Sequence, residues 1–193
     1  MIYMKFLVIV DVQHDFVDGS LGSDEAFDAY MRIRDYLQNV DENYRVLFTQ
    51  DTHNANYLDT FEGKRLPVKH CIKGEHGWKI MSDLRAEFDN APYVIHKDTF
   101  GSFKLPIEMQ EILNFNEEVD EIEICGLCTD ICVISNALIL RAAFPSAKIT
   151  CFANLCAGTT PINHVNALEV MKSCQIDVAY IAKVGEYNDS SNQ

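Results

Sequence analysis

One cysteine, Cys132, has a position from which a thiol could act as a nucleophile. It follows Gly126, a residue that permits a tight turn after the apolar run 121–125. Thr129 or Asp130 can then cap a helix. Cys132 would lie in the first turn of that helix, where the dipole and the free N–H groups favour a thiolate and can bind an oxyanion. The alternative is a small buried apolar residue, which is how most lone cysteines are used.

Two charged residues follow other apolar runs in the same way. Asp11 comes directly after the run 5–10, where a carboxylate could serve as a general base or merely cap a loop or helix. Lys97 comes after the run 93–96. It could be partly buried and paired with an acid, or it could be an ordinary lysine whose head reaches water. Residue type alone leaves both interpretations open for each.

The polar stretch from residue 50 to residue 79 is too long for a plain connector. It carries several carboxylates and imidazoles: Asp51, His53, Asp59, Glu62, His70 and His76. The pair Asp51-x-His53 can present both ligand types to one ion, with Glu62 and His70 as further ligands. A mixed nitrogen and oxygen set suits zinc, iron or manganese rather than calcium. A solvated acidic loop is the alternative.

A second kind of metal site is suggested by Cys125, Cys128 and Cys132, which form a C-x2-C-x3-C pattern. Such thiols could hold iron–sulfur or zinc with outside help. The predicted elements argue against it, because Cys125 ends a strand and Cys132 lies in a helix, whereas cluster ligands usually project from one loop. The chain has seven cysteines and no secretory signal, so we expect reduced thiols.

These residues depend on alternating strands and helices to position them. We expect strands at residues 5–10, 45–49, 93–96, 121–125, 148–152 and 176–181. We expect helices near 26–37, 106–113 and 130–143, and one that begins at Thr160-Pro161. The alternation predicts an α/β fold, a doubly wound parallel six-stranded sheet with helices on both faces in a Rossmann-type three-layer sandwich. Ligands of such sheets bind at the carboxyl ends of the strands.

Length and charge bound the class of protein. The 193 residues suit a single domain over 1–187, with a frayed tail at 188–193. The 16 basic and 29 acidic residues leave a net charge of −13, which argues against nucleic-acid and anionic-membrane partners. The apolar run at 6–10 is too short to span a bilayer, and no signal peptide precedes it. The expected location is the cytoplasm.

Four motifs occur in one order along most of the chain. They are Val10-Asp11-Val-Gln13-His-Asp15-Phe16, Thr49-Gln-Asp51-Thr-His53, Lys97 with Phe100-Gly-Ser-Phe103, and Gly126-Leu-Cys-Thr129-Asp130-Ile-Cys132-Val133. In these motifs the chain resembles the isochorismatase-like cysteine hydrolases, and within them the nicotinamidases. Each motif stands at the end of a predicted strand, which makes the set specific although any one motif would be weak.

The resemblance implies a catalytic triad of Asp11, Lys97 and Cys132. It also implies an oxyanion hole formed by the backbone N–H groups of Cys128 and Cys132. The bond between Leu127 and Cys128 matches the place where these proteins keep a cis peptide bond.

The resemblance further implies one divalent transition metal, for which we expect zinc, with iron or manganese as alternatives. Its ligands would be Asp51, His53, Glu62 and His70. Some nicotinamidases have His as the third ligand, but no His lies between His53 and His70. Glu62 fits the Glu type, with Asp59 in reserve. Aromatic walls for a flat ring would come from two residues, Phe16 and Phe100.

The implied activity is hydrolysis of nicotinamide to nicotinate and ammonia through a thioester. The partner would be a small amide, and the family often forms homo-oligomers. Alternative functions are a related hydrolase that acts on another small amide or on isochorismate, a non-catalytic binding protein, and a cysteine-cluster protein.

Overall fold

Six strands form one parallel sheet in the order β3-β2-β1-β4-β5-β6. The computed structural model describes residues 2–40, 43–86 and 93–182. The strands are β1 (Ile2–Val10), β2 (Tyr44–Asp51), β3 (Tyr93–Lys97), β4 (Glu117–Leu127), β5 (Lys148–Ala157) and β6 (Asp177–Ala179). The chain order reverses between β1 and β4, which makes this the switch point of a doubly wound sheet and confirms the predicted fold class.

The core of the sheet lies around β1, whose apolar run the sequence predicts as a buried strand. Residues 6–10 of β1 are fully buried, because β1 is covered on both faces and paired on both edges. Strands β1 to β5 all extend beyond the predicted ranges, since backbone pairing continues past the apolar residues. Strand β6 is shorter than the predicted 176–181.

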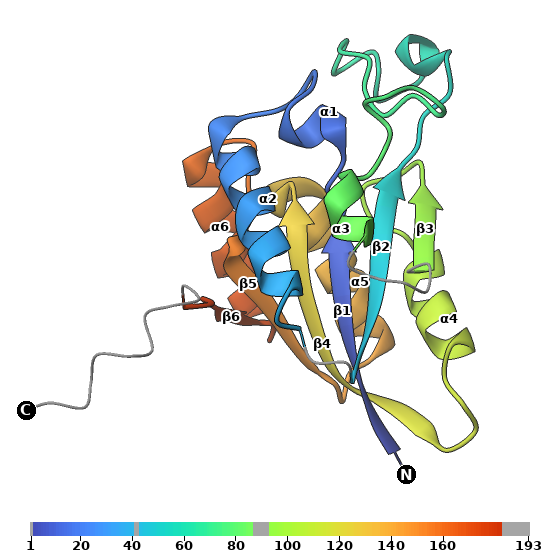
Figure 1. Cartoon of the computed structure of the whole chain (residues 1–193), viewed down its shortest axis with the longest axis vertical. Coiled ribbons are helices and arrows are strands. Elements are labelled where there is room, and N and C mark those ends of the chain that lie inside the picture. Colours follow the sequence, from blue (N-terminus) through green and yellow to red (C-terminus); the bar gives the residue numbers. More distant parts are fainter. Residues whose placement is uncertain (1, 41–42, 87–92, 183–193) are drawn as a thin grey trace, which may run out of the picture.

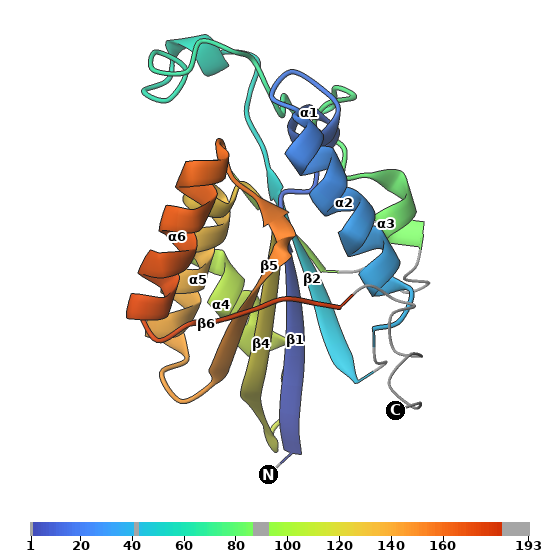
Figure 2. The same cartoon turned by 90° about the vertical axis from the view of Figure 1, so that its left-hand side faces the viewer.

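Helices cover both faces of the sheet (Figures 1 and 2). Figure 2 shows α2 (Asp24–Leu37) and α3 (Ser82–Ala86) on one face, with α4 (Lys104–Glu111), α5 (Ile134–Ala143) and α6 (Pro161–Ser173) on the other. Helix α2 begins where Ser23 Oγ accepts the Ala26 N–H at 3.1 Å, and α6 begins where Thr160 Oγ1 accepts the Asn163 N–H at 3.2 Å. The short helices α1 (His14–Val17) and α3 have too few turns to show a period in the sequence.

The helix predicted at 130–143 begins differently. A π-helical turn, η2 (Thr129–Val133), precedes α5, and neither Thr129 nor Asp130 caps it. Both side chains are bonded to the segment around the start of α6 instead. The capping prediction is therefore wrong, because tertiary partners compete for these polar groups.

Two further expectations concern the C-terminal tail and membrane-spanning segments. The tail predicted at 188–193 and the domain boundary at 187 lie outside the described residues. Within residues 2–40, 43–86 and 93–182, no helix has the length and apolar character needed to cross a membrane.

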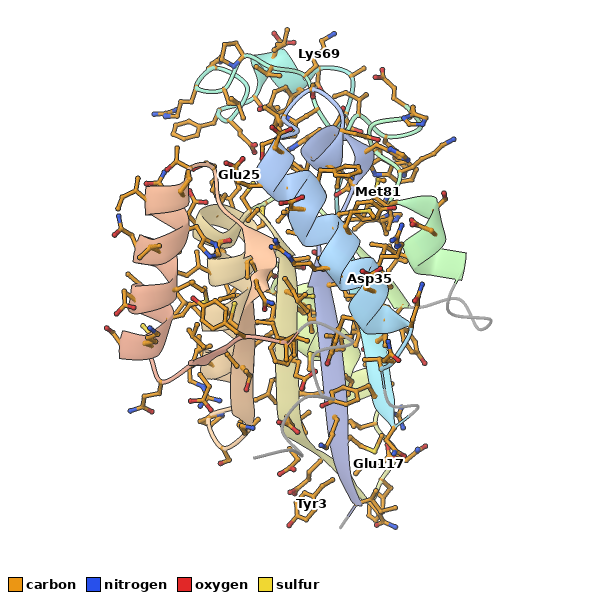
Figure 3. The ribbon with its side chains drawn as sticks, turned by 60° about the vertical axis from the view of Figure 1, so that its left-hand side comes forward. Tyr3, Glu25, Asp35, Lys69, Met81 and Glu117 are labelled. Atoms are coloured by element: carbon orange, nitrogen blue, oxygen red, sulfur yellow. The ribbon has the colours of Figure 1, made fainter. Side chains whose placement is uncertain are left out.

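The segment between β2 and α3 extends beyond the carboxyl ends of β1 and β2 (Figure 1). It includes the turn η1 (Tyr57–Asp59). Lys69 of this segment lies at one end of the molecule, and Tyr3 and Glu117 lie at the opposite end (Figure 3). The polar loop is therefore placed over the edge of the sheet where a ligand is expected.

Candidate active site

The register of the sheet makes the carboxyl ends of four strands level with one another. Val10 of β1 pairs with Thr49 on one side and with Gly126 on the other. Asp51, the last residue of β2, pairs with Lys97, the last residue of β3. The candidate residues at these ends therefore lie within a small volume although they are far apart in the sequence.

Asp11, Lys97 and Cys132 meet in one buried cluster. Lys97 Nζ lies 2.5 Å from Asp11 Oδ2 and 3.5 Å from Cys132 Sγ. The same ammonium lies 3.4 Å from Asp51 Oδ1. The side chains of Lys97 and Asp11 are 1% and 0% exposed, so this ion pair has little screening by water.

Asp11 is held where the chain leaves β1. Its φ of 49° turns the backbone out of the strand, and its N–H donates to Thr49 O at 3.2 Å. Thr49 Oγ1 donates to Asp11 Oδ1 at 2.7 Å. One carboxylate oxygen therefore faces a hydroxyl and the other faces Lys97, which fixes the orientation of the acid.

The segment that carries Cys132 depends on Gly126. Its φ is 123°, and a Cβ at this position would lie 2.1 Å from Val10 O. The close approach of β4 to β1 at this point therefore requires glycine. The next bond, Leu127–Cys128, is cis, as the resemblance implies. The N–H groups of Ile131 and Val133 then donate to Cys128 O, each at 3.1 Å.

The π-helical turn η2 is bonded to the start of α6 through two side-chain pairs. Thr129 Oγ1 and His164 Nδ1 lie 2.8 Å apart. Asp130 accepts from the N–H of Thr159 at 2.7 Å and from its hydroxyl at 2.5 Å. No signal in the sequence identifies His164, because nothing in a helix pattern distinguishes an exposed histidine from one that reaches a residue in another element.

A second set of hydrogen bonds joins the segment that carries Cys132 to the loop after β3. The fully buried amide of Asn136 donates to Cys132 O at 2.8 Å and to Phe100 O at 3.2 Å. Its Oδ1 accepts the Ser102 N–H at 3.0 Å. Asn136 was also missed, although a polar residue on the buried face of α5 is a detectable signal.

Burial and mutual charge shift the pKa values of Cys132, Asp11 and Lys97. Burial raises the pKa of the Cys132 thiol well above its usual range, and Asp11 raises it further, while Lys97 lowers it. Burial likewise raises the pKa of Asp11, against the pull of Lys97. Burial lowers the pKa of Lys97, but the groups around it outweigh burial and leave that pKa above its ordinary value.

The geometry gives no support to the expected thiolate at a helix start. The turn is π-helical, and burial together with the charge of Asp11 raises the pKa of the Cys132 thiol. A proton acceptor is needed when the thiol reacts, and the carboxylate of Asp11 is the group in position.

A group of metal-ligand type lies beside the cluster. Asp51, His53 and His70 are buried, and each offers a ligand atom within 4.8 Å of the others. His53 Nε2 lies 3.0 Å from Asp51 Oδ2, and His70 Nε2 lies 3.6 Å from the same oxygen. Glu62 Oε1 lies 3.9 Å from His53 Nε2 and 3.7 Å from His70 Nε2.

The loop directs Glu62 and not Asp59 toward this group. Tyr57 is fully buried, and its ring centroid lies 4.7 Å from that of His53 and 4.8 Å from that of His70. Asp59, two residues further on in η1, is exposed. The chain then turns back so that Glu62 is half-buried against the imidazoles. The sequence missed Tyr57, which packs against both histidines.

The donor set fits a divalent transition metal. His53 Nε2 is buried, and although it lies 3.0 Å from Asp51 Oδ2, the two groups do not have the alignment of a hydrogen bond. His70 Nδ1 lies 2.9 Å from Val68 O, so this nitrogen carries the proton and Nε2 keeps a lone pair for a metal. Two imidazole nitrogens and two carboxylates suit zinc, iron or manganese.

The two aromatic residues proposed as substrate walls differ in placement. Phe16 is buried, with its ring centroid 5.6 Å from that of His70. Phe100 is 48% exposed, and its carbonyl is linked to the site through Asn136. The structure therefore brings Phe16 beside the metal-ligand group and leaves the ring of Phe100 half in solvent.

The seven cysteines are free thiols. Cys125, Cys128 and Cys132 do not converge, since within the described ranges the one group of three or more ligands is Asp51, His53 and His70. The cysteine-cluster alternative is therefore wrong, and Cys125 is fully buried within β4.

Comparison with known proteins agrees with this geometry. The sequence profile of the Isochorismatase domain matches residues 5–183. The nicotinamidase/pyrazinamidase of Mycobacterium tuberculosis is 27% identical over 188 residues, which cover 91% of this chain and 98% of that protein.

Two solved structures have the same fold. The pyrazinamidase of Pyrococcus horikoshii in complex with zinc has a TM-score of 0.77 at 23% identity, covering 92% of this chain and 99% of that one. The nicotinamidase/pyrazinamidase of Bacillus subtilis has a TM-score of 0.75 at 26% identity, covering 91% and 99%. The chain therefore belongs to the isochorismatase family and is a hydrolase of its nicotinamidase-like group.

Proposed function

We propose that this protein hydrolyses nicotinamide to nicotinate and ammonia, with Cys132 as nucleophile and a bound divalent metal as an aid to substrate binding. The observation that carries the proposal is the buried cluster of Asp11, Lys97 and Cys132 directly beside an Asp/His/His group. The relatives named above are nicotinamidases and pyrazinamidases, which supports a heteroaromatic carboxamide as substrate.

The first step is transfer of the Cys132 proton to Asp11 as the sulfur attacks the carboxamide carbon. The raised pKa of Asp11 makes this carboxylate a stronger base than an exposed aspartate. Lys97 contacts both partners, so its ammonium stabilises negative charge whether it lies on oxygen or on sulfur.

The carbonyl oxygen becomes an oxyanion in the tetrahedral intermediate. The backbone N–H groups of Cys128 and Cys132 are the proposed donors. In other acyl-transfer enzymes, one donor of this kind contributes about 3–4 kcal/mol to transition-state stabilisation. The bonds that hold η2 to α6 keep these two peptide groups in one orientation.

Asp11 then returns its proton to the departing nitrogen, the C–N bond breaks and ammonia leaves. A thioester joins the acyl group to Cys132. Water attacks this carbonyl, with Asp11 again accepting a proton, and the C–S bond breaks. The sulfur regains a proton and nicotinate is released, so one amide and one water give one acid and one ammonia.

Asp51, His53, Glu62 and His70 are the residues proposed to hold the metal. When bound, the metal supplies a Lewis-acidic site for the pyridine nitrogen, directly or through a water ligand. Phe16 lies against His70 and can pack on the ring of the substrate. Phe100 is proposed as the second wall. Together they would orient the amide toward Cys132.

The decisive test is Cys132→Ala, with Cys174→Ala as a control in a thiol outside the cluster. Ammonia release from nicotinamide should fall by at least about 10⁴-fold in Cys132→Ala, because covalent attack is lost. Bound metal, measured by elemental analysis, should be unchanged. Full activity in Cys132→Ala would contradict the assignment of the nucleophile.

The substrate and the metal are tested by a panel of small carboxamides assayed for ammonia with and without chelator. Nicotinamide and pyrazinamide should be preferred, and chelator should suppress turnover. Asp51→Ala should abolish stoichiometric metal. A preference for an aliphatic amide, or for isochorismate in a parallel assay, would favour the alternative substrates. Unchanged activity in a metal-free wild type would exclude the metal from the reaction.

A further inference from the structure

We propose that Gln13 is a positioning residue for the metal ligands, because its buried side-chain amide joins the backbone of Asp51 to the segment that carries His70. This inference rests on the metal site of the proposed function. It concerns a residue that is outside both the triad and the ligand set.

The amide of Gln13 holds Asp51 from both sides. Gln13 is fully buried, and its Oε1 accepts the Asp51 N–H at 2.7 Å. Its Nε2 donates to Asp51 O at 2.9 Å. The two peptide groups that flank the Cα of this ligand are therefore bonded to one side chain.

The reason for this contact is the early end of β1. The ladder between β1 and β2 ends at Val10 and Thr49, since Asp11 turns away with a φ of 49°. Thr49 O faces β1, and in a strand the backbone of Asp51 faces the same side. A side-chain amide has the donor and the acceptor of a peptide group, so Gln13 continues the ladder where the strand itself has left.

The same amide reaches the segment after His70. Gln13 Nε2 lies 3.3 Å from Cys71 Sγ and 2.7 Å from Trp78 O. Asp15, two residues along, accepts the Cys71 N–H through Oδ2 at 2.7 Å. The turn after β1 therefore fixes both the end of β2 and the end of the metal loop.

The two ligand segments are also bonded directly. The N–H of His53 donates to Cys71 O at 2.9 Å, and the N–H of Lys73 donates to His53 O at 2.9 Å. These bonds set the distance between the segments, and Gln13 sets their position relative to the triad. The N–H of Gln13 donates to Asp11 O at 2.8 Å, so the turn after β1 contains both Asp11 and the side chain that holds Asp51.

The experiment compares Gln13→Leu with Gln50→Leu. Both glutamines are buried and donate from Nε2 to Trp78 O at 2.7 Å. Each variant loses that bond, but Gln13→Leu also loses both bonds to Asp51 and the contact with Cys71 Sγ. Zinc affinity is measured on the purified proteins by competition with a chromophoric chelator. Thermal unfolding in excess chelator measures stability without metal.

We expect Gln13→Leu to raise the Kd for zinc about 10- to 100-fold, which is the usual effect of removing a partner of metal ligands. Gln50→Leu should change it less than about 3-fold. Gln13→Asn keeps a neutral amide but is one methylene shorter, so it should also weaken zinc binding and serves as the test if Gln13→Leu does not fold.

Equal zinc affinities in the folded Gln13 variants and the wild type, with a change in thermal stability alone, would overturn the inference. A wild type that binds no zinc would overturn it as well. A wild type that binds zinc but releases no ammonia from nicotinamide contradicts the proposed function instead, and the comparison of affinities still decides the role of Gln13.

Discussion

At the scale of single residues, Lys97 is the buried cation that balances the negative charges of the site. Its ammonium nitrogen lies 2.5 Å from Asp11 Oδ2, 3.4 Å from Asp51 Oδ1 and 3.5 Å from Cys132 Sγ. Two carboxylates so close together would repel each other strongly in a site from which water is excluded. Lys97 compensates both, and it thereby links the proposed base to a proposed metal ligand.

Lys97→Met should therefore affect both stability and activity. Removing one member of a buried ion pair costs about 3–5 kcal/mol of unfolding free energy, because the other charge is left without a partner. Ammonia release should fall by at least about 10²-fold. Urea denaturation at neutral pH and the amidase assay provide the two measurements.

Lys148→Met is the matched control, since its ammonium lies 3.0 Å from Glu121 but its side chain is 62% exposed. The loss should be below about 1 kcal/mol, as is typical of exposed pairs. Similar losses in the two variants would mean that the Lys97 pair is not desolvated in solution.

At the scale of elements, the site depends on how closely β4 approaches β1. A Cβ added at Gly126 would clash with the carbonyl oxygen of Val10, directly before the cis bond and η2. The same strand end thus determines where η2, the turn that carries Cys132, begins. A side chain at this position would separate β1 and β4, the two strands that lead to Asp11 and Cys132.

Gly126→Ala should lower the unfolding free energy by about 1–3 kcal/mol through backbone strain, with a further loss from the contact with Val10 O. At about 2–4 °C per kcal/mol for a chain of this size, the melting temperature should fall by several degrees. Amidase activity should fall with it, because η2 would shift relative to Asp11.

Gly74→Ala separates backbone strain from steric contact as causes of the lost stability. Gly74 also has a positive φ, 89°, but an added Cβ would meet nothing within 4 Å. This variant should show the strain alone and keep its activity. A Gly126→Ala protein as stable and as active as Gly74→Ala would show that the close approach of β4 to β1 is unimportant.

At the scale of the whole molecule, the two ends of the sheet carry different kinds of residue. The carboxyl ends carry the site, whereas the amino ends carry exposed charges that pair across strands. Glu121 of β4 lies between Lys5 at 2.9 Å and Lys148 at 3.0 Å. Hydrogen bonds from these two lysines hold the pKa of Glu121 below its ordinary value of 4.5. Such pairs offset part of the repulsion within a chain of net charge −13.

The sign of the pH effect follows from that lowered pKa. Glu121 contributes stability that is present above about pH 4.5, the pKa of the unfolded chain, and is lost as the pH falls through the lower folded value. Glu121→Gln should therefore cost about 0.5–1 kcal/mol near pH 6. The difference from the wild type should shrink toward pH 3.

Urea denaturation of both proteins between pH 3 and pH 7 checks this expectation. Glu118→Gln in the same strand is a suitable control, since no lysine pair is found at that carboxylate among the described residues. A wild-type advantage that stays constant down to pH 3 would contradict the assignment.

The sequence alone predicted six strands, a parallel sheet and the strand ends at which the candidate residues lie. Apolar runs bounded by polar residues are a local signal, and the rule for parallel sheets then places Asp11, Lys97 and Cys132 at one edge. The structure confirms this because the register, set by burial of the same runs, makes those ends level.

Only the tertiary structure decided which polar groups are partners. The path of a loop brings Glu62, and not Asp59, beside the imidazoles. Thr129 and Asp130 contact the start of α6 and do not cap a helix. Gln13 is bonded to Asp51. Each of these bonds joins residues separated by many positions in the chain. A local pattern contains no information about such partners, because the free energy of a hydrogen bond depends on where the rest of the fold brings its other half.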